Sequence, residues 1–223
     1  MVYRERVSPL VRDTVPFLHK AIKDGKHILI EGAQSTILDI DFGLYPFVTS
    51  SNCSVGGCME WSRLISHELD EEVSRTELIN ETGDLLVNRG HEYGVTTGRK
   101  RRVGWLDMVM LNFSNMISGF TGIAITKLDI LDIFKEIKIG IGYYLNGKKL
   151  ESFPALAEDL KHVTVEYITL PGWNLDTSKA RSFSDLPPNA QAYVRKIQEL
   201  MNVPVKWIGV GQARESIIEV DQI

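Results

Sequence analysis

Thr126-Lys127-Leu128-Asp129 is a short polar segment that directly follows an apolar stretch predicted to form a buried strand. The carboxylate of Asp129 can accept two hydrogen bonds together, from N1 and from the exocyclic amine of guanine, and adenine offers no such pair. The stem of Lys127 can lie along a purine face while its ammonium reaches outward. The segment therefore predicts a site that reads guanine, with the alternative that Asp129 only caps the helix that follows.

The stretch Gly94–Arg102 (GVTTGRKRR) concentrates positive charge on one predicted loop of an otherwise acidic chain. Its two glycines allow a ligand to approach the backbone closely, and its two threonines supply hydroxyl groups. Arginine side chains match the oxygens of carboxylates and phosphates in a bidentate way. These residues favour a small polyanionic ligand. The alternatives are a solvated basic turn and RNA binding, and RNA is disfavoured because no aromatic residues are interleaved with the basic ones.

Three further segments follow predicted strands or begin helices, and each has a plain structural alternative. Small residues in 31–36 (EGAQST) let a ligand reach the backbone, and the Gln34 amide can donate and accept hydrogen bonds toward a base edge. Four consecutive polar side chains end the stretch 45–52 and suit a phosphate or a ribose, or merely a helix start. The glycines of Gly209-Val210-Gly211 can let a base lie flat on the backbone, or simply end a strand.

The sequence lacks the phosphate loop G-x-x-x-x-G-K-[ST] and any other glycine-rich loop ending in lysine at a strand–helix junction. The five histidines are scattered without the spacing of metal ligands, so no metal is assigned to them. The chain thus has features that suit a guanine base and anions, but no evident cradle for a triphosphate.

The elements that must position these residues follow from apolar periodicity and turn signals. Helices are predicted from Ser8 to Gly25, over Trp105–Met116, briefly from Asp129, and from Pro188 to about Met201; strands are predicted over His27–Ile30, Phe120–Thr126, Val163–Leu170 and Val205–Val210. Residues 138–145 and 148–150 flank Asn146-Gly147 and read as a β-hairpin. The alternation predicts an α/β fold: a partial mixed or parallel central sheet with flanking helices and a β-hairpin.

Composition bounds the class of protein. The chain has 223 residues, 25 Lys and Arg against 29 Asp and Glu, a net charge of −4 and 43% hydrophobic residues, which excludes disorder for the whole chain. We expect no membrane span and no secretory signal, and the acidic balance argues against a dedicated nucleic-acid binder. Two cysteines, Cys53 and Cys58, cannot build a disulfide framework, which favours a cytoplasmic location.

Several long blocks then occur in fixed order and resemble the carboxyl-terminal half of adenylosuccinate synthetase. The blocks are EGAQSTILDIDFGLYPFVTSSN (31–52), GHEYGVTTGRKRRVGWLD (90–107), ITKLDILD (125–132), LPGW (170–173) and VKWIGVG (205–211). The resemblance covers residues 1–223 as the carboxyl-terminal portion of such a domain, with an atypical segment at 58–75.

The resemblance implies a GTP-dependent C–N ligase of purine (AMP) biosynthesis, which joins IMP and L-aspartate with magnesium as cofactor. In that family, phosphate passes from GTP to the 6-oxygen of IMP, and the aspartate amine then displaces it. The implied partners are these small molecules and a second copy of the chain in a homodimer, with no nucleic acid and no membrane.

Carried over residue by residue, the resemblance implies three sets of binding residues. The IMP set is Gln34, Thr49 and Arg99; the aspartate set is Val95, Thr96, Thr97, Gly98, Arg99, Lys100 and Arg101; the GTP set is Arg101, Lys127, Leu128, Asp129, Gly209, Val210 and Gly211.

The family's phosphate loop, its catalytic acid and base and its magnesium ligands belong to the amino-terminal half, which the resemblance does not find in these residues. No catalytic residue is therefore assigned, and we expect the chain by itself to be inactive. The alternative is a non-catalytic guanine-nucleotide or anion-binding module that associates with full-length subunits. A third possibility is a chain that does not fold alone because its strand edges are bare.

Overall fold

The computed structural model describes residues 2–32, 34–54, 75–94, 98–154 and 156–221. It divides into two units, Met1–Ala33 and Gln34–Ile223, which are described separately. Several predicted features lie outside the described residues: Val95, Thr96, Thr97, Cys58 and the atypical segment 58–75 apart from Arg75.

The first unit contains two helices rather than the single predicted one. α1 spans Val2–Val7, a 3-10 turn (η1) covers Ser8–Leu10, and α2 spans Thr14–Lys23. The prediction of a start at Ser8 is wrong for α2, because Asp13 adopts extended backbone and its side chain accepts a hydrogen bond from the Val15 N–H at 3.2 Å. The predicted end is confirmed, since Gly25 takes a φ of +66° directly after the helix.

The predicted strand at His27–Ile30 is wrong. These residues carry no strand assignment, and Leu29 is 94% exposed. A strand needs a neighbouring strand to pair its backbone groups, and none of the described residues pairs with this segment. Apolar character alone therefore does not make a strand here.

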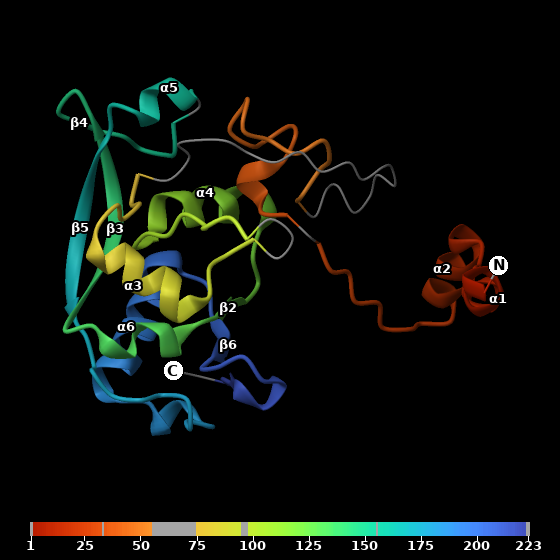
Figure 1. Cartoon of the computed structure of the whole chain (residues 1–223). Helices are drawn as coiled ribbons and strands as arrows, with labels where there is room; N and C mark the ends of the chain where they lie inside the picture. The colour runs from red at the N-terminus through yellow and green to blue at the C-terminus, as the bar shows by residue number, and fades with distance from the viewer. Residues whose placement is uncertain (1, 33, 55–74, 95–97, 155, 222–223) are drawn as a thin grey trace. The chain divides into compact units, whose positions relative to one another are not determined.

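The second unit holds a four-stranded mixed sheet around a long central strand. β3 (Glu136–Leu145) pairs in parallel with β1 (Leu106–Asp107) and antiparallel with β4 (Lys148–Lys149) and β5 (Thr164–Pro171). β3 and β5 lie side by side over most of their length (Figure 1). The predicted hairpin is confirmed: Asn146 and Gly147 both have positive φ, the requirement of a two-residue type I′ turn.

A second, three-stranded sheet carries the segments of greatest chemical interest. β2 (Ile123–Ile125) runs parallel to β6 (Val205–Gly209), and β6 is antiparallel to β7 (Ile217–Glu219). β2 is shorter than the predicted strand, since residues 120–122 and Thr126 lie outside it, and it is only partly buried. The mixed α/β class is confirmed, with the described strands divided between two sheets.

Helices cover and join these sheets. Among the described residues of this unit, the helices are α3 (Glu81–Gly90), α4 (Met108–Ser118), α5 (Ala157–Leu160) and α6 (Pro188–Met201), with 3-10 turns η2 (Thr36–Leu38), η4 (Leu128–Ile133), η5 (Phe183–Asp185) and η6 (Arg214–Ser216). α4 begins three residues later than predicted because Asp107 caps it, accepting hydrogen bonds from the backbone N–H groups of Val109 and Met110.

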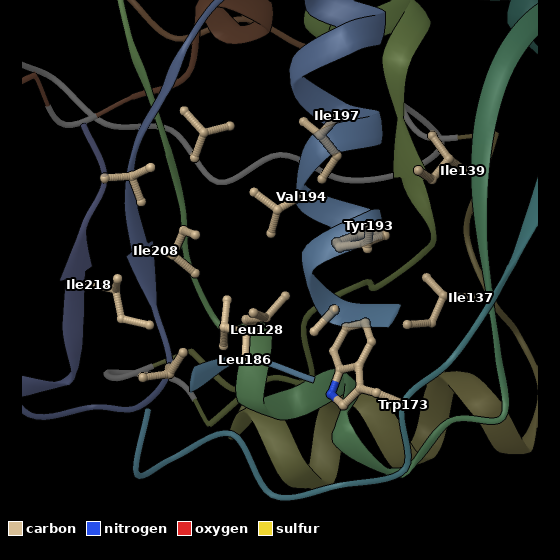
Figure 2. Packing of buried hydrophobic residues seen from close by; sticks show 14 of the residues in the cluster. Leu128, Ile137, Ile139, Trp173, Leu186, Tyr193, Val194, Ile197, Ile208 and Ile218 are labelled. Carbon is tan, nitrogen blue, oxygen red and sulfur yellow. The ribbon is translucent and has the colours of Figure 1, made fainter. Parts of the chain in front are cut away.

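α6 stands between the two sheets, and its apolar face forms the centre of the main core. Figure 2 shows Tyr193, Val194 and Ile197 of this helix between Ile208 and Ile218 of one sheet and Ile137 and Ile139 of the other. Leu128, at the start of η4, is fully buried in the same cluster. The predicted guanine-reading segment is thus anchored in the core through its central residue.

Candidate functional site

The segment 126–129 lies at the carboxyl end of β2, as predicted. Lys127 takes a left-handed backbone conformation, with φ at 61°, and the chain turns there from the strand into η4. Leu128 points into the core, so its two neighbours Lys127 and Asp129 are left on the outer side of the turn, exposed and half-exposed respectively. A strand end followed by a tight turn is where open α/β sheets present ligand-binding groups.

The glycines 209–211 lie beside this turn. Because β2 and β6 are parallel and Ile125 pairs with Ile208, the two strands end together. A Cβ added to Gly209 would stand 3.4 Å from the Cα of Thr126, which is ordinary contact distance. The structure therefore brings the two predicted walls of the guanine site to one sheet edge.

A buried carboxylate holds η4 from behind. Asp132 accepts hydrogen bonds from the Trp173 indole N–H at 2.6 Å, from the Thr177 backbone N–H at 2.8 Å and from the Thr177 hydroxyl at 2.9 Å. Trp173 belongs to the LPGW block and Asp132 to the ITKLDILD block, so this contact joins the block of the predicted guanine segment to one for which no role was predicted.

The basic segment folds as a hairpin-like loop. The Arg101 N–H donates to the Glu92 carbonyl at 2.8 Å, the Gly94 N–H donates to the Arg99 carbonyl at 2.7 Å, and Gly98 takes a φ of +66°. The predicted loop is confirmed over its described residues. Lys100 pairs with Asp84 of α3, an ion pair at the surface.

One carboxylate joins the basic loop to the guanine segment. Glu92 pairs through Oε1 with Lys127 and through Oε2 with the Arg101 guanidinium, at 3.2 Å. Lys127 also donates to the Gly90 carbonyl at 3.1 Å. Burial alone raises the pKa of Glu92, but the hydrogen bonds and charges of Lys127 and Arg101 outweigh it and lower the pKa below its usual value.

The last turn of α3 also forms hydrogen bonds with the backbone of η4. The Arg89 guanidinium donates to the Asp129 carbonyl at 3.0 Å and to the Ile130 carbonyl at 3.3 Å. Through these contacts Arg89, Gly90 and Glu92 hold three residues of the turn after β2: Lys127, Asp129 and Ile130. The predicted basic loop and the predicted guanine segment therefore meet at one place, the end of α3.

We call this meeting place, formed by Arg89, Gly90 and Glu92 with their partners in the two segments, the α3 junction. A cavity of about 350 Å³ opens beside it. Arg102, Glu92 and Lys127 supply its charged side chains, and its apolar wall comes from α3, η4, β3 and α6. Asp129, Gly209 and Gly211 are not among its lining residues, so the acid and the glycines lie outside this cavity although they share the same turn.

Burial, more than any charged neighbour, dominates the electrostatics of the Asp129 carboxylate. Among the described residues, no side chain donates a hydrogen bond to its carboxylate. Burial raises its pKa above the usual value, the charge of Asp132 adds to the rise, and its own N–H, Arg89 and Lys127 offset only part of it. A ligand that presents two N–H donors to this carboxylate would relieve that cost.

Gln34 and Thr49 lie on a separate loop, residues 34–54. Gln34 is exposed, whereas Thr49 is buried and its N–H donates to the Leu38 carbonyl at 2.7 Å. The loop packs on α4, and its Ile37 and Leu44 join a second apolar cluster around Tyr143.

Asp39 orders this loop. Its carboxylate is wholly buried and accepts from the backbone N–H groups of Asp41, Phe42, Cys53 and Ser54. Burial raises the pKa of Asp39, but these four hydrogen bonds lower it more, so its pKa lies below the usual value. Thr49 is carried by the loop that this carboxylate closes.

The described residues hold neither a metal-binding cluster nor a membrane-spanning helix. No group of three or more His, Cys, Asp or Glu among the described residues is placed to hold a metal ion. None of the helices found in that part of the chain is long and apolar enough to cross a membrane.

Two sheets joined by a central helix, with loops at the shared carboxyl end of parallel strands, define a layered α/β protein. The family model of adenylosuccinate synthetase matches residues 1–218. Among solved structures, the chain is similar to fully ligated adenylosuccinate synthetase from Plasmodium falciparum, with 34% identity and a TM-score of 0.90. The match covers 98% of this chain and 56% of that one. The chain belongs to the adenylosuccinate synthetase family.

Sequence reasoning missed the residues that position the site. Arg89, Glu92, Asp39 and Asp132 received no role, although all but Arg89 lie in the blocks that carry the resemblance. The available signal was that these charged side chains lie within long recognisable blocks. Their partners lie up to 45 residues away along the chain, so local spacing does not reveal them.

Proposed function

We propose that this chain forms the IMP-, aspartate- and guanine-nucleotide-binding part of an adenylosuccinate synthetase that acts as a homodimer. The reaction would transfer a phosphoryl group from GTP to the 6-oxygen of IMP, which turns that oxygen into a leaving group. The amine of L-aspartate then displaces the phosphate, and the products are adenylosuccinate, GDP and inorganic phosphate. Family membership supports the proposal.

The observation that carries it is that Glu92, after the end of α3, contacts both Arg101 of the cationic loop and Lys127 of the segment that holds the half-buried Asp129. In the proposed assignment, Lys127, Leu128 and Asp129 bind guanine, with Gly209, Val210 and Gly211 as the second wall. Asp129 is held at the turn by Arg89 and is matched to the two donors of guanine.

The anions would be held by the loop. We assign Val95, Thr96, Thr97, Gly98, Arg99, Lys100 and Arg101 to aspartate, Arg99 also to IMP, and Arg101 also to GTP. Cations fixed before the reaction stabilise the charge that develops as phosphate is transferred and displaced. Gln34 and Thr49 would hold the IMP side, on the loop that Asp39 closes.

Magnesium is implied by the resemblance, but the described residues hold no group that fits it. The described residues would bind and orient the substrates and stabilise charge, without holding the metal.

Isothermal titration calorimetry with GDP tests the guanine assignment. We expect the wild-type chain to bind GDP in preference to ADP, and Asp129→Ala to lose that preference. Glu158→Ala, an exposed acid on α5, is the matched control and should bind GDP as the wild type does. Equal affinity for GDP in wild type and Asp129→Ala would contradict the assignment.

A second experiment separates catalysis from binding. We propose that the 223-residue chain by itself does not turn over IMP, because no residue in it is assigned as acid or base. An assay with IMP, GTP, aspartate and magnesium should then yield no adenylosuccinate, and measurable product would refute this. Retained GDP binding without turnover would favour the alternative of a binding module that associates with full-length subunits.

A further inference from the structure

At the end of α3 the basic loop and the guanine segment contact a common side chain, that of Glu92. Glu92 offers one carboxylate oxygen to Lys127 and the other to Arg101. Its side chain is 19% exposed, while those of Lys127 and Arg101 are 50% and 55% exposed. The Glu92 side chain is thus more buried than the two cations that it contacts.

The backbone around Glu92 makes it a rigid anchor. Its N–H donates to the Val87 carbonyl at 3.0 Å, which ties it to the last turn of α3, and its carbonyl accepts from the Arg101 N–H at 2.8 Å. Glu92 therefore contacts Arg101 through both main chain and side chain. Any displacement of Glu92 must shift the basic loop.

The other end of the link is equally constrained. The Lys127 ammonium lies between the Glu92 carboxylate and the Gly90 carbonyl, so both its acceptors come from the end of α3. Its stem is left to line the cavity together with Thr126. An ammonium fixed in this way positions the stem rather than reaching for a ligand.

We propose that Glu92 is a positioning residue that couples the two binding segments, holding Lys127 and Arg101 in one arrangement so that order at either segment supports the other. This inference rests on the proposed function only for the identity of the ligands. The coupling itself is a property of the ligand-free chain. Removing the charge from Glu92 leaves two half-exposed cations without their shared anion and frees both segments.

Hydrogen exchange of the full chain without ligand tests the coupling directly. Glu92→Gln keeps the size of the side chain, and it should raise amide exchange rates by about threefold both in 98–104 and in 126–130, as expected for loss of a partly exposed ionic contact. Glu77→Gln is the matched control: Glu77 is 23% exposed and pairs with Arg102 of the same loop, but not with Lys127. It should loosen 98–104 alone. Faster exchange in only one segment of Glu92→Gln would overturn the proposal.

A second variant covers the case in which Glu92→Gln unfolds. Lys127→Met keeps an apolar stem and changes no residue of the basic loop. It should still raise amide exchange in 98–104, because the Glu92 carboxylate that Arg101 contacts then loses its contact with Lys127. Lys149→Met is its control, since Lys149 pairs with Glu166 at 2.7 Å, far along the chain from either segment. No change in 98–104 for Lys127→Met would refute the coupling.

GDP titration gives the functional readout. Glu92→Gln should weaken GDP binding about fivefold, and Glu77→Gln should leave it within twofold of wild type. If the wild type binds GDP and Glu92→Gln binds it with the same affinity, the inference is overturned and the proposed function stands. If the wild type binds no GDP while exchange is still coupled, the proposed function fails and the inference stands.

Discussion

Two carboxylates organise the candidate site in opposite ways, and the contrast explains what each region can do. Asp39 is wholly buried and accepts four backbone N–H groups, all within 15 residues of it in the chain. Glu92 accepts side-chain cations from two segments, one of them 35 residues away. The first closes a single loop, and the second connects two.

The environment of each carboxylate fits this division. Backbone donors cannot move without rearranging the chain, so Asp39 fixes a shape. Lysine and arginine side chains can exchange partners, so the contacts of Glu92 can respond to a ligand. The loop of residues 34–54 is therefore expected to be preformed, and the α3 junction to respond to ligand binding.

Asp39→Ala should produce the largest loss of stability. Four N–H groups would lose a buried acceptor, and the free energy of unfolding should fall by about 3 kcal/mol, with part of the cost relieved by water. Urea denaturation measures this. Asp41→Ala, two residues away and exposed, should cost less than about 0.5 kcal/mol. Equal losses in the two variants would erase the proposed role of Asp39.

Asp129→Asn should separate stability from binding. The raised pKa of Asp129 means that the folded state disfavours its charge at neutral pH, so removing the charge should not lower the melting temperature. Guanine binding should fall at least about tenfold, because an amide cannot accept both donors of the base. A lower melting temperature with unchanged GDP affinity would show that Asp129 is structural.

Acid should weaken the loop of residues 34–54 through Asp39. Its pKa is lowered in the folded state, so its stabilising contribution is complete above the unfolded pKa of about 4 and is lost as the pH falls through the lower folded value. The difference in unfolding free energy between wild type and Asp39→Asn should therefore shrink below about pH 4. Urea titrations from pH 7 to pH 2 follow it, and a constant difference would contradict the cause given for the shift.

Glu92→Gln should lower global stability less than Asp39→Ala does. Its partners are about half exposed, and solvent screens their attraction, so the loss should be about 0.5–1 kcal/mol. A double-mutant cycle with Lys127→Met isolates the pair. A loss as large as that of Asp39→Ala would mean that the two carboxylates do the same work, and the comparison would fail.

Elements with strong local signals were predictable from sequence. α6 has a full apolar face, and the hairpin has Asn146-Gly147 at the two positions that need positive φ, so local chemistry determines both. The predictions failed where a neighbouring residue or strand determines the structure. Residues 27–30 have strand composition, but none of the described residues pairs with them, and Asp13 rather than Ser8 caps the second helix.

The residues of the candidate site also differ in whether local sequence or the fold reveals their role. The chemistry of Asp129 and of the loop cations follows from residue type and from placement after a strand, so sequence could nominate them. Arg89 and Glu92 act through partners that only the fold brings near, which is why their roles required the structure.

The central claim is that the basic loop and the guanine segment belong to one binding site. Backbone NMR of the full chain during GDP titration tests it most directly. The account predicts that amide resonances in 98–104, 126–130 and 209–211 shift together with one dissociation constant, while those of 136–145 stay in place. Shifts confined to one of these segments, or with different dissociation constants for each, would contradict it.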